Sequence, residues 1–113
     1  MGLDTSHNCW HGPYSSFNNF RRSIMLALGN PPLDSMEGFG GNTPWSEIKD
    51  KSLNALLNHS DCDGKIDKEG CRELALAIEK ALPLFNDETR RKAARFAAGL
   101  LEAAMLGEDV IFN

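Results

Sequence analysis

The sequence predicts an all-α fold: a single-domain bundle of about four helices with an EF-hand-like helix-loop-helix in the middle. Apolar residues recur at three- and four-residue spacings along most of the 113-residue chain. Residue types that favour helix ends lie at the borders of these periodic segments, and alternating strand patterns are almost absent. A chain of this length can bury one modest core, so we expect one domain over residues 1–113.

We expect the first helix over residues 15–28, where Phe17, Phe20 and Ile24 lie on one apolar stripe. A serine would cap this helix, and a glycine followed by Asn-Pro-Pro would end it. The loop over 29–43 is rich in Gly and Pro, which break both periodicities. Its few apolar side chains indicate that it packs against the bundle.

Three further helices should follow this loop. Thr43 is a good N-cap, and Pro44 suits a first helical turn, so the second helix is expected over 43–58. The third is expected over 67–82 and the fourth over 86–106, each with an Asp or Asn at its start.

The C-terminal tail is more apolar than an exposed end would be. Val110, Ile111 and Phe112 follow a glycine that should end the fourth helix. We expect the tail to fold back onto the bundle near Trp10 and Tyr14, because burying these side chains removes apolar surface from water. The alternative is a tail that stays exposed and docks on another chain.

Four of the nine aromatic residues lie between positions 10 and 20, directly before Arg21 and Arg22. Aromatic rings beside basic side chains can form a recognition surface. The helical spacing of Phe17 and Phe20 favours the other interpretation, an aromatic anchor of the core.

Residues 59–70, HSDCDGKIDKEG, align with the twelve-residue calcium loop of an EF-hand when Gly64 takes the sixth position. Glycine there permits the sharp turn that the loop needs. The ligand positions 3, 5, 7 and 9 are then occupied by Asp61, Asp63, Lys65 (through its carbonyl) and Asp67.

Both ends of this loop depart from the calcium motif. His59 offers nitrogen at position 1, where Ca²⁺ prefers oxygen, and Gly70 occupies position 12, where the motif has glutamate. Glu69 lies one residue early, and the short strand at Ile66 has no second loop to pair with. We therefore expect weak Ca²⁺ binding through Asp67, Glu69 and the two loop aspartates. The alternative is a purely structural turn in which Asp67 caps the next helix.

The histidines and cysteines lie in two windows, with His7, Cys9 and His11 in the first and His59, Cys62 and Cys71 in the second. Four such side chains brought together could bind Zn²⁺, although no Cys-x-x-Cys pair is present. Cys9 between two histidines also suggests a thiol activated by a neighbouring base. A Zn-like or thiol-dependent function is therefore the alternative hypothesis, and it would use Cys9, Cys62, His7, His11 and His59. The other interpretation places Cys71 in the core and His59 as a cap of the second helix.

Charge and hydropathy disfavour two classes of protein, those that bind nucleic acid and those that span a membrane. The net charge is −4 and neither half of the chain is basic, which disfavours a nucleic-acid surface. No apolar run approaches the length of a membrane span, and the N-terminus lacks the pattern of a secretory signal. With three cysteines, an odd number, we expect reduced thiols and a cytoplasmic location. The one basic cluster follows Asp87 and Glu88, so local ion pairs are expected there instead of a phosphate site. It comprises Arg90, Arg91, Lys92 and Arg95.

Two segments, HNCWHGPYSSFNNFRR and LLNHSDCDGKIDKEGC, resemble paired signatures of small uncharacterised proteins of bacteria and their phages. In those proteins the His-Ser-Asp-Cys-Asp-Gly string also follows a leucine-rich helix. The resemblance implies that a histidine at loop position 1 is normal for the group, and it implies no activity. It also implies that five residues act as a unit: His59, Asp61, Cys62, Asp63 and Gly64.

The sequence favours a binding or interaction module over an enzyme, because no complete set of catalytic groups is evident. The expected partner is another protein or a second copy of the chain, with Ca²⁺ as the candidate cofactor and Zn²⁺ as the alternative.

Overall fold

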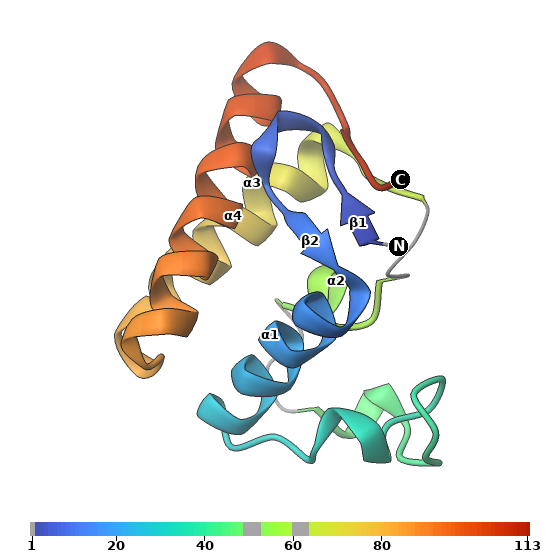
Figure 1. Ribbon diagram of the computed structural model, residues 1–113. Coiled ribbons are helices and arrows are strands. Elements are labelled where there is room, and N and C mark those ends of the chain that lie inside the picture. Colours follow the sequence, from blue (N-terminus) through green and yellow to red (C-terminus); the bar gives the residue numbers. More distant parts are fainter. Residues whose placement is uncertain (1, 49–52, 60–63) are drawn as a thin grey trace.

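The computed structural model describes residues 2–48, 53–59 and 64–113, and in this part of the chain helices dominate (Figure 1). The helices are α1 (Tyr14–Ala27), α2 (Asn54–Leu57), α3 (Lys68–Ala81) and α4 (Asp87–Leu106). Short 3₁₀ turns are η1 (Ser6–Asn8), η2 (Leu33–Ser35), η3 (Trp45–Glu47) and η4 (Leu82–Leu84). The strands are β1 (Gly2–Asp4), β2 (His11–Pro13), β3 (Lys65–Ile66) and β4 (Val110–Ile111). The long helices α3 and α4 lie side by side.

The prediction of an all-α fold is wrong, because two small antiparallel sheets accompany the helices. β1 pairs with β2, and β3 pairs with β4. Each strand has only two or three residues, too few to leave an alternating pattern in the sequence. β3 and β4 are also far apart along the chain, so no turn sequence between them could predict their pairing.

The C-terminal tail joins the two sheets, which confirms that it folds back within the chain. The Phe112 N–H donates to the Gly64 carbonyl at 2.9 Å on one side. On the other side, Asn113 and Asp4 exchange two backbone hydrogen bonds, of 2.9 and 3.2 Å. Figure 1 accordingly shows the two chain ends close together, with the tail between the N-terminal strands and β3.

The aromatic cluster is the centre of the core. The Phe17 ring lies 5.4 Å from Trp10, 6.4 Å from Phe96 and 6.1 Å from Phe112, measured between centroids. Phe20 stacks on Trp10 at 5.0 Å. These contacts confirm the core interpretation of the cluster, and Phe112 of the tail packs against Phe17.

The ends of the long helices follow the sequence signals. Asp67 and Asn86 cap α3 and α4 by accepting the N–H groups of Gly70 at 2.7 Å and Thr89 at 2.8 Å. Gly107 ends α4 with a left-handed φ of 68°. α1 begins after Pro13, without a serine cap.

The predicted second helix over 43–58 is wrong at its start, and among the described residues only Asn54–Leu57 at its end is α-helical. Pro44 is extended, only a 3₁₀ turn follows it, and α2 starts at Asn54; residues 49–52 lie outside the described part. Thr43 cannot act as the N-cap because its backbone is bound to the preceding loop. Its N–H donates to Ser35 O, and its carbonyl accepts the Glu37 N–H, each at 2.9 Å.

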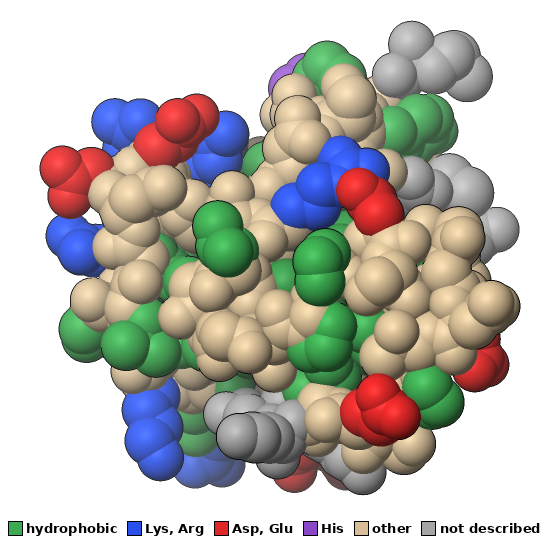
Figure 2. Space-filling model, turned by 90° about the horizontal axis from the view of Figure 1, so that it is seen from below, with side chains coloured by type: hydrophobic (Ala, Val, Ile, Leu, Met, Phe, Trp, Pro, Cys, Tyr) green, Lys and Arg blue, Asp and Glu red, His purple; other side chains and the backbone are tan. Residues whose placement is uncertain are grey.

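Basic and acidic side chains lie next to one another on the face shown in Figure 2. Arg22 pairs with Asp34 at 2.9 Å, and Lys92 pairs with Glu88 at 3.1 Å. No helix among the described residues is long and apolar enough to cross a membrane.

We predict that Phe112→Ala will lower the free energy of unfolding by roughly 3–5 kcal/mol, because the ring is 2% exposed and packs on Phe17. The matched control is Ile111→Ala in the same tail. Its side chain is 40% exposed, so its loss should cost less than about 1 kcal/mol. Urea unfolding of both variants measures the difference, and equal small losses would show that the tail is not part of the core.

Candidate functional site

The Asp-rich loop runs from α2 to β3, and its described ends already show how it turns. Gly64 has φ +93°, the left-handed conformation expected for the sixth position of an EF-hand loop. A Cβ at Gly64 would lie 3.3 Å from the His59 ring. Asp61, Cys62 and Asp63 lie outside the described residues, so their assignment as ligands stays a prediction.

The short strand of the loop has found a partner within the chain. Ile66 pairs with Val110, and Lys65 pairs with Ile111, in an antiparallel register. In an EF-hand this place is normally taken by the strand of a second loop. Here the C-terminal tail supplies the pairing strand. Cys71 of α3 also contacts the loop strand, because its thiol donates a hydrogen bond to the Ile66 carbonyl at 3.3 Å.

A buried arginine holds the start of the loop. Arg21 of α1 is 1% exposed, and its Nη1 donates to the carbonyls of Leu56 at 3.4 Å and Leu57 at 3.3 Å, and to that of His59. These carbonyls end α2, where the helix leaves its last acceptors without intrahelical partners. The predicted cap of α2 by His59 is therefore wrong, since Arg21 performs this role.

Sequence reasoning treated Arg21 only as a basic residue beside aromatics. The signal was its position, four residues after Phe17 and three before Ile24, on the apolar stripe of α1. Its guanidinium carbon lies 4.6 Å from the Phe17 ring centroid and 5.0 Å from that of Phe39, so aromatic faces enclose the cation. Asn18 accepts a further hydrogen bond from Nη2.

The imidazole of His59 closes the loop across its turn. Its Nε2 lies 3.1 Å from the Lys65 carbonyl oxygen, so the residues aligned with positions 1 and 7 meet. The Phe112 ring lies 4.0 Å from the imidazole, between centroids, and supports it from the tail. The histidine nitrogen and the carbonyl thus face the same side of the turn.

The other predicted ligands have structural contacts of their own. Asp67 uses one carboxylate oxygen to cap α3, and Glu69 is exposed in the first turn of that helix. Within residues 2–48, 53–59 and 64–113, no group of three His, Cys, Asp or Glu side chains could hold a metal ion. A complete cation site would therefore need the loop aspartates.

Asp109 is a residue at this loop that the sequence did not single out. Its carboxylate accepts the Lys68 N–H at 2.9 Å and pairs with Lys65 Nζ at 3.2 Å. These contacts, with the Lys65 hydrogen bond foremost, lower the pKa of Asp109. The tail thus contributes a second carboxylate, beside the Asp67 cap, at the N-terminus of α3.

The two N-terminal histidines point to separate partners. His7 Nε2 lies 2.9 Å from Glu108, and its Nδ1 lies 2.8 Å from the Ser6 hydroxyl. His11 is exposed and pairs with Asp4 at 3.2 Å. They do not converge with Cys9 on a common centre in the part that the structure describes.

Cys9 and Cys71 are buried and free. Burial raises the pKa of Cys9 to about 12, and burial also raises the pKa of Cys71. The Cys9 side chain packs directly against α4 at Gly99. A larger residue would not fit there, since a Cβ at position 99 would lie 2.5 Å from Cys9 Sγ. A thiol that keeps its proton is a poor nucleophile and metal ligand, so these two cysteines do not support the thiol or zinc hypothesis.

The chain was compared with family models, with curated proteins and with solved structures, and no match was found.

We predict that Arg21→Met will lower the free energy of unfolding by roughly 2 kcal/mol or more, because the carbonyls at the end of α2 lose their buried donor. Arg22→Met is the matched control. Arg22 is exposed and pairs with Asp34, and an exposed pair contributes less than about 1 kcal/mol. Urea unfolding measures both values; similar small losses would mean that Arg21 does not hold the loop.

A second prediction concerns alkaline pH. The pKa of Cys9 is about 12 in the native state against 9.0 ordinarily, so above pH 9 the unfolded chain releases this proton first. The contribution of Cys9 to stability should be intact below pH 9 and decline as pH rises toward 12. Unfolding free energies measured between pH 8 and about 10.5 should fall less steeply in Cys9→Ala than in the unaltered chain. Identical slopes would contradict the burial argument.

Proposed function

We propose that the protein is a small binding module whose EF-hand-like loop takes a divalent cation, Ca²⁺ in the first place, weakly and as a structural ligand. The observation that carries this proposal is the closed turn, in which His59 Nε2 and the Lys65 carbonyl oxygen approach to 3.1 Å. Gly64 in the left-handed conformation and the paired strand at Ile66 agree with the same loop type.

The donor set explains why binding should be weak. Lys65 offers a carbonyl oxygen and Asp67 and Glu69 offer carboxylates, which are hard donors suited to Ca²⁺. However, the Lys65 oxygen already accepts from His59, and Asp67 is engaged as a helix cap. A cation would compete with these contacts, and position 12 supplies no glutamate, since it is Gly70.

The proposed role is structural because contacts within the protein hold the loop at both ends. Arg21 binds the carbonyls at its start, and the tail pairs with β3 at its end. A bound cation would add stability to a junction that exists already, and would not create the fold. A protein partner or a second copy of the chain remains the partner that we propose for this module.

We predict a Kd for Ca²⁺ on the order of 10⁻⁴ M or weaker. With that affinity, 1 mM Ca²⁺ should raise the free energy of unfolding by about 1.4 kcal/mol. Calorimetric titration and urea unfolding with Ca²⁺ or EDTA measure these effects. Glu69→Gln should weaken binding, whereas Glu73→Gln, an exposed carboxylate one turn farther along α3, should leave it unchanged.

Two results would count against this proposal. Absence of binding at about 10 mM Ca²⁺ would leave the loop as a turn only. Equal effects of the two glutamate variants would mean that the cation is attracted by general negative charge and not by the loop.

A further inference from the structure

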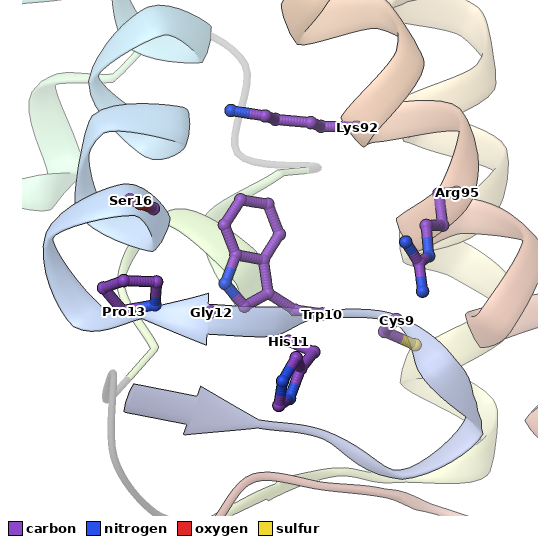
Figure 3. A pocket seen from close by; sticks show the side chains of 8 residues that line it. All are labelled: Cys9, Trp10, His11, Gly12, Pro13, Ser16, Lys92 and Arg95. Carbon is purple, nitrogen blue, oxygen red and sulfur yellow. The ribbon is translucent and has the colours of Figure 1, made fainter. Parts of the chain in front are cut away.

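A cavity of about 250 Å³ lies away from the Asp-rich loop, between α4 and the N-terminal segment that contains β2 and the start of α1 (Figure 3). Trp10 lines it just before β2, His11 and Gly12 line it from β2, and Ser16 lines it from the first turn of α1. Lys92 and Arg95 line it from α4, one turn apart, and Figure 3 shows both extending from that helix toward the Trp10 segment.

The charge of this lining is opposite to that of the chain. The protein has a net charge of −4, yet the residues that line the cavity include two permanent cations and no Asp or Glu. His11, which pairs with Asp4, adds an imidazole to the lining. A cavity with this lining favours anions, and the walls of a cleft strengthen such a field.

Arg95 has donors that the fold does not use. Its Nε donates to the Asn8 carbonyl at 3.3 Å, which fixes the direction of the side chain. Its two terminal Nη groups donate to none of the described residues. The remaining fork of N–H groups matches the two oxygens of a carboxylate or a phosphate.

Lys92 can supply a second charge without loss of structure. Its Nζ pairs with Glu88 at 3.1 Å, but both side chains are solvent-accessible, and an i,i+4 pair of this kind contributes little to stability. The same Nζ lies 5.9 Å from the Trp10 ring, at the wall of the cavity. The sequence predicted a solvated face with local ion pairs here, and the Lys92–Glu88 pair agrees with it, whereas Arg95 lacks a carboxylate partner among the described residues.

The wall of the cavity is rigid before any ligand arrives. Trp10 is 6% exposed, stacked on Phe20 at 5.0 Å and edge-on to Phe17 at 5.4 Å. The hydroxyl of Ser16 has no hydrogen-bond partner within the described residues. A ligand that enters would therefore find placed donors and lose little free energy in ordering the protein.

We propose that this cavity is a binding site for a small oxyanion, a molecule that carries a phosphate or carboxylate group. The fork of Arg95 binds two of its oxygens, Lys92 supplies the second positive charge, and Ser16 lines the cavity from α1. This site is separate from the cation loop, so the two proposals succeed or fail independently.

The test is a titration of the whole chain with two probes, inorganic phosphate and benzoate, at constant ionic strength set with NaCl. The reporters are the two indole N–H signals in ¹H–¹⁵N correlation spectra. Trp10 lines the cavity, while Trp45 donates its N–H to the Glu37 carbonyl at 2.9 Å and serves as the internal control. We expect a saturable shift of the Trp10 signal alone with at least one probe, and the probe that binds identifies the phosphate or the carboxylate source.

The variants separate a built site from general charge attraction. Arg95→Gln should raise Kd at least about tenfold, because it removes a charge-assisted fork, and Lys92→Gln should raise it less. Arg91→Gln removes one charge from the same helix outside the cavity lining and should leave Kd unchanged. Shifts that do not saturate, shifts of both indoles together, or equal losses in the Arg91 and Arg95 variants would overturn the proposal. All three side chains are on the surface, so the variants are expected to fold, and a thermal melt of each checks this.

Discussion

The buried guanidinium of Arg21 is the contact on which the arrangement of the loop depends. It stands on α1 and binds the last carbonyls of α2, so two helices that are distant in sequence share one polar junction. Burying a cation is costly unless its hydrogen bonds are satisfied, and backbone carbonyls at a helix end are suitable acceptors because they carry partial negative charge. The rings of Phe17 and Phe39 also pack against the guanidinium group. The same group thereby ends α2 and sets the point at which the Asp-rich loop leaves it.

The tail performs the complementary task at the other end of the loop. A single EF-hand-like unit exposes an unpaired strand edge, which usually pairs with a second unit. β4 covers that edge at Ile66, and the residues after it continue into hydrogen bonds with Asp4. Phe112 fills the core beneath the pairing. One short tail thus pairs with β3 and ties it to the N-terminal strands.

The long helices could be predicted from the sequence because their signals are local. Asp67, Asn86 and Gly107 are cap residues next to segments of strong apolar periodicity. The burial of the tail could be predicted from its apolar side chains. The sheets could not be predicted, since strands of two or three residues acquire their identity from partners far along the chain. The start of the second helix was predicted wrongly because Thr43 has a side chain suited to an N-cap, but its backbone N–H is hydrogen-bonded to Ser35. Arg21 was overlooked because its charge suggests a surface, whereas its place on the stripe beside Phe17 indicates burial.

The two proposed sites have opposite charge preferences and are connected through the two small sheets. β2 lines the oxyanion cavity and pairs with β1, which continues to the tail at Asn113, and the tail reaches Gly64 at the edge of the loop. This chain of hydrogen bonds joins backbone groups of the protein, so each site is built on a scaffold that the other elements stabilise. The residues that stabilise the fold therefore differ from those proposed to bind ligands. The buried aromatic cluster and Arg21 stabilise the scaffold, while Lys92, Arg95 and Glu69 lie at its surface. Exposed side chains on such a support can exchange one partner for another at little cost in stability, which agrees with the binding role that we propose.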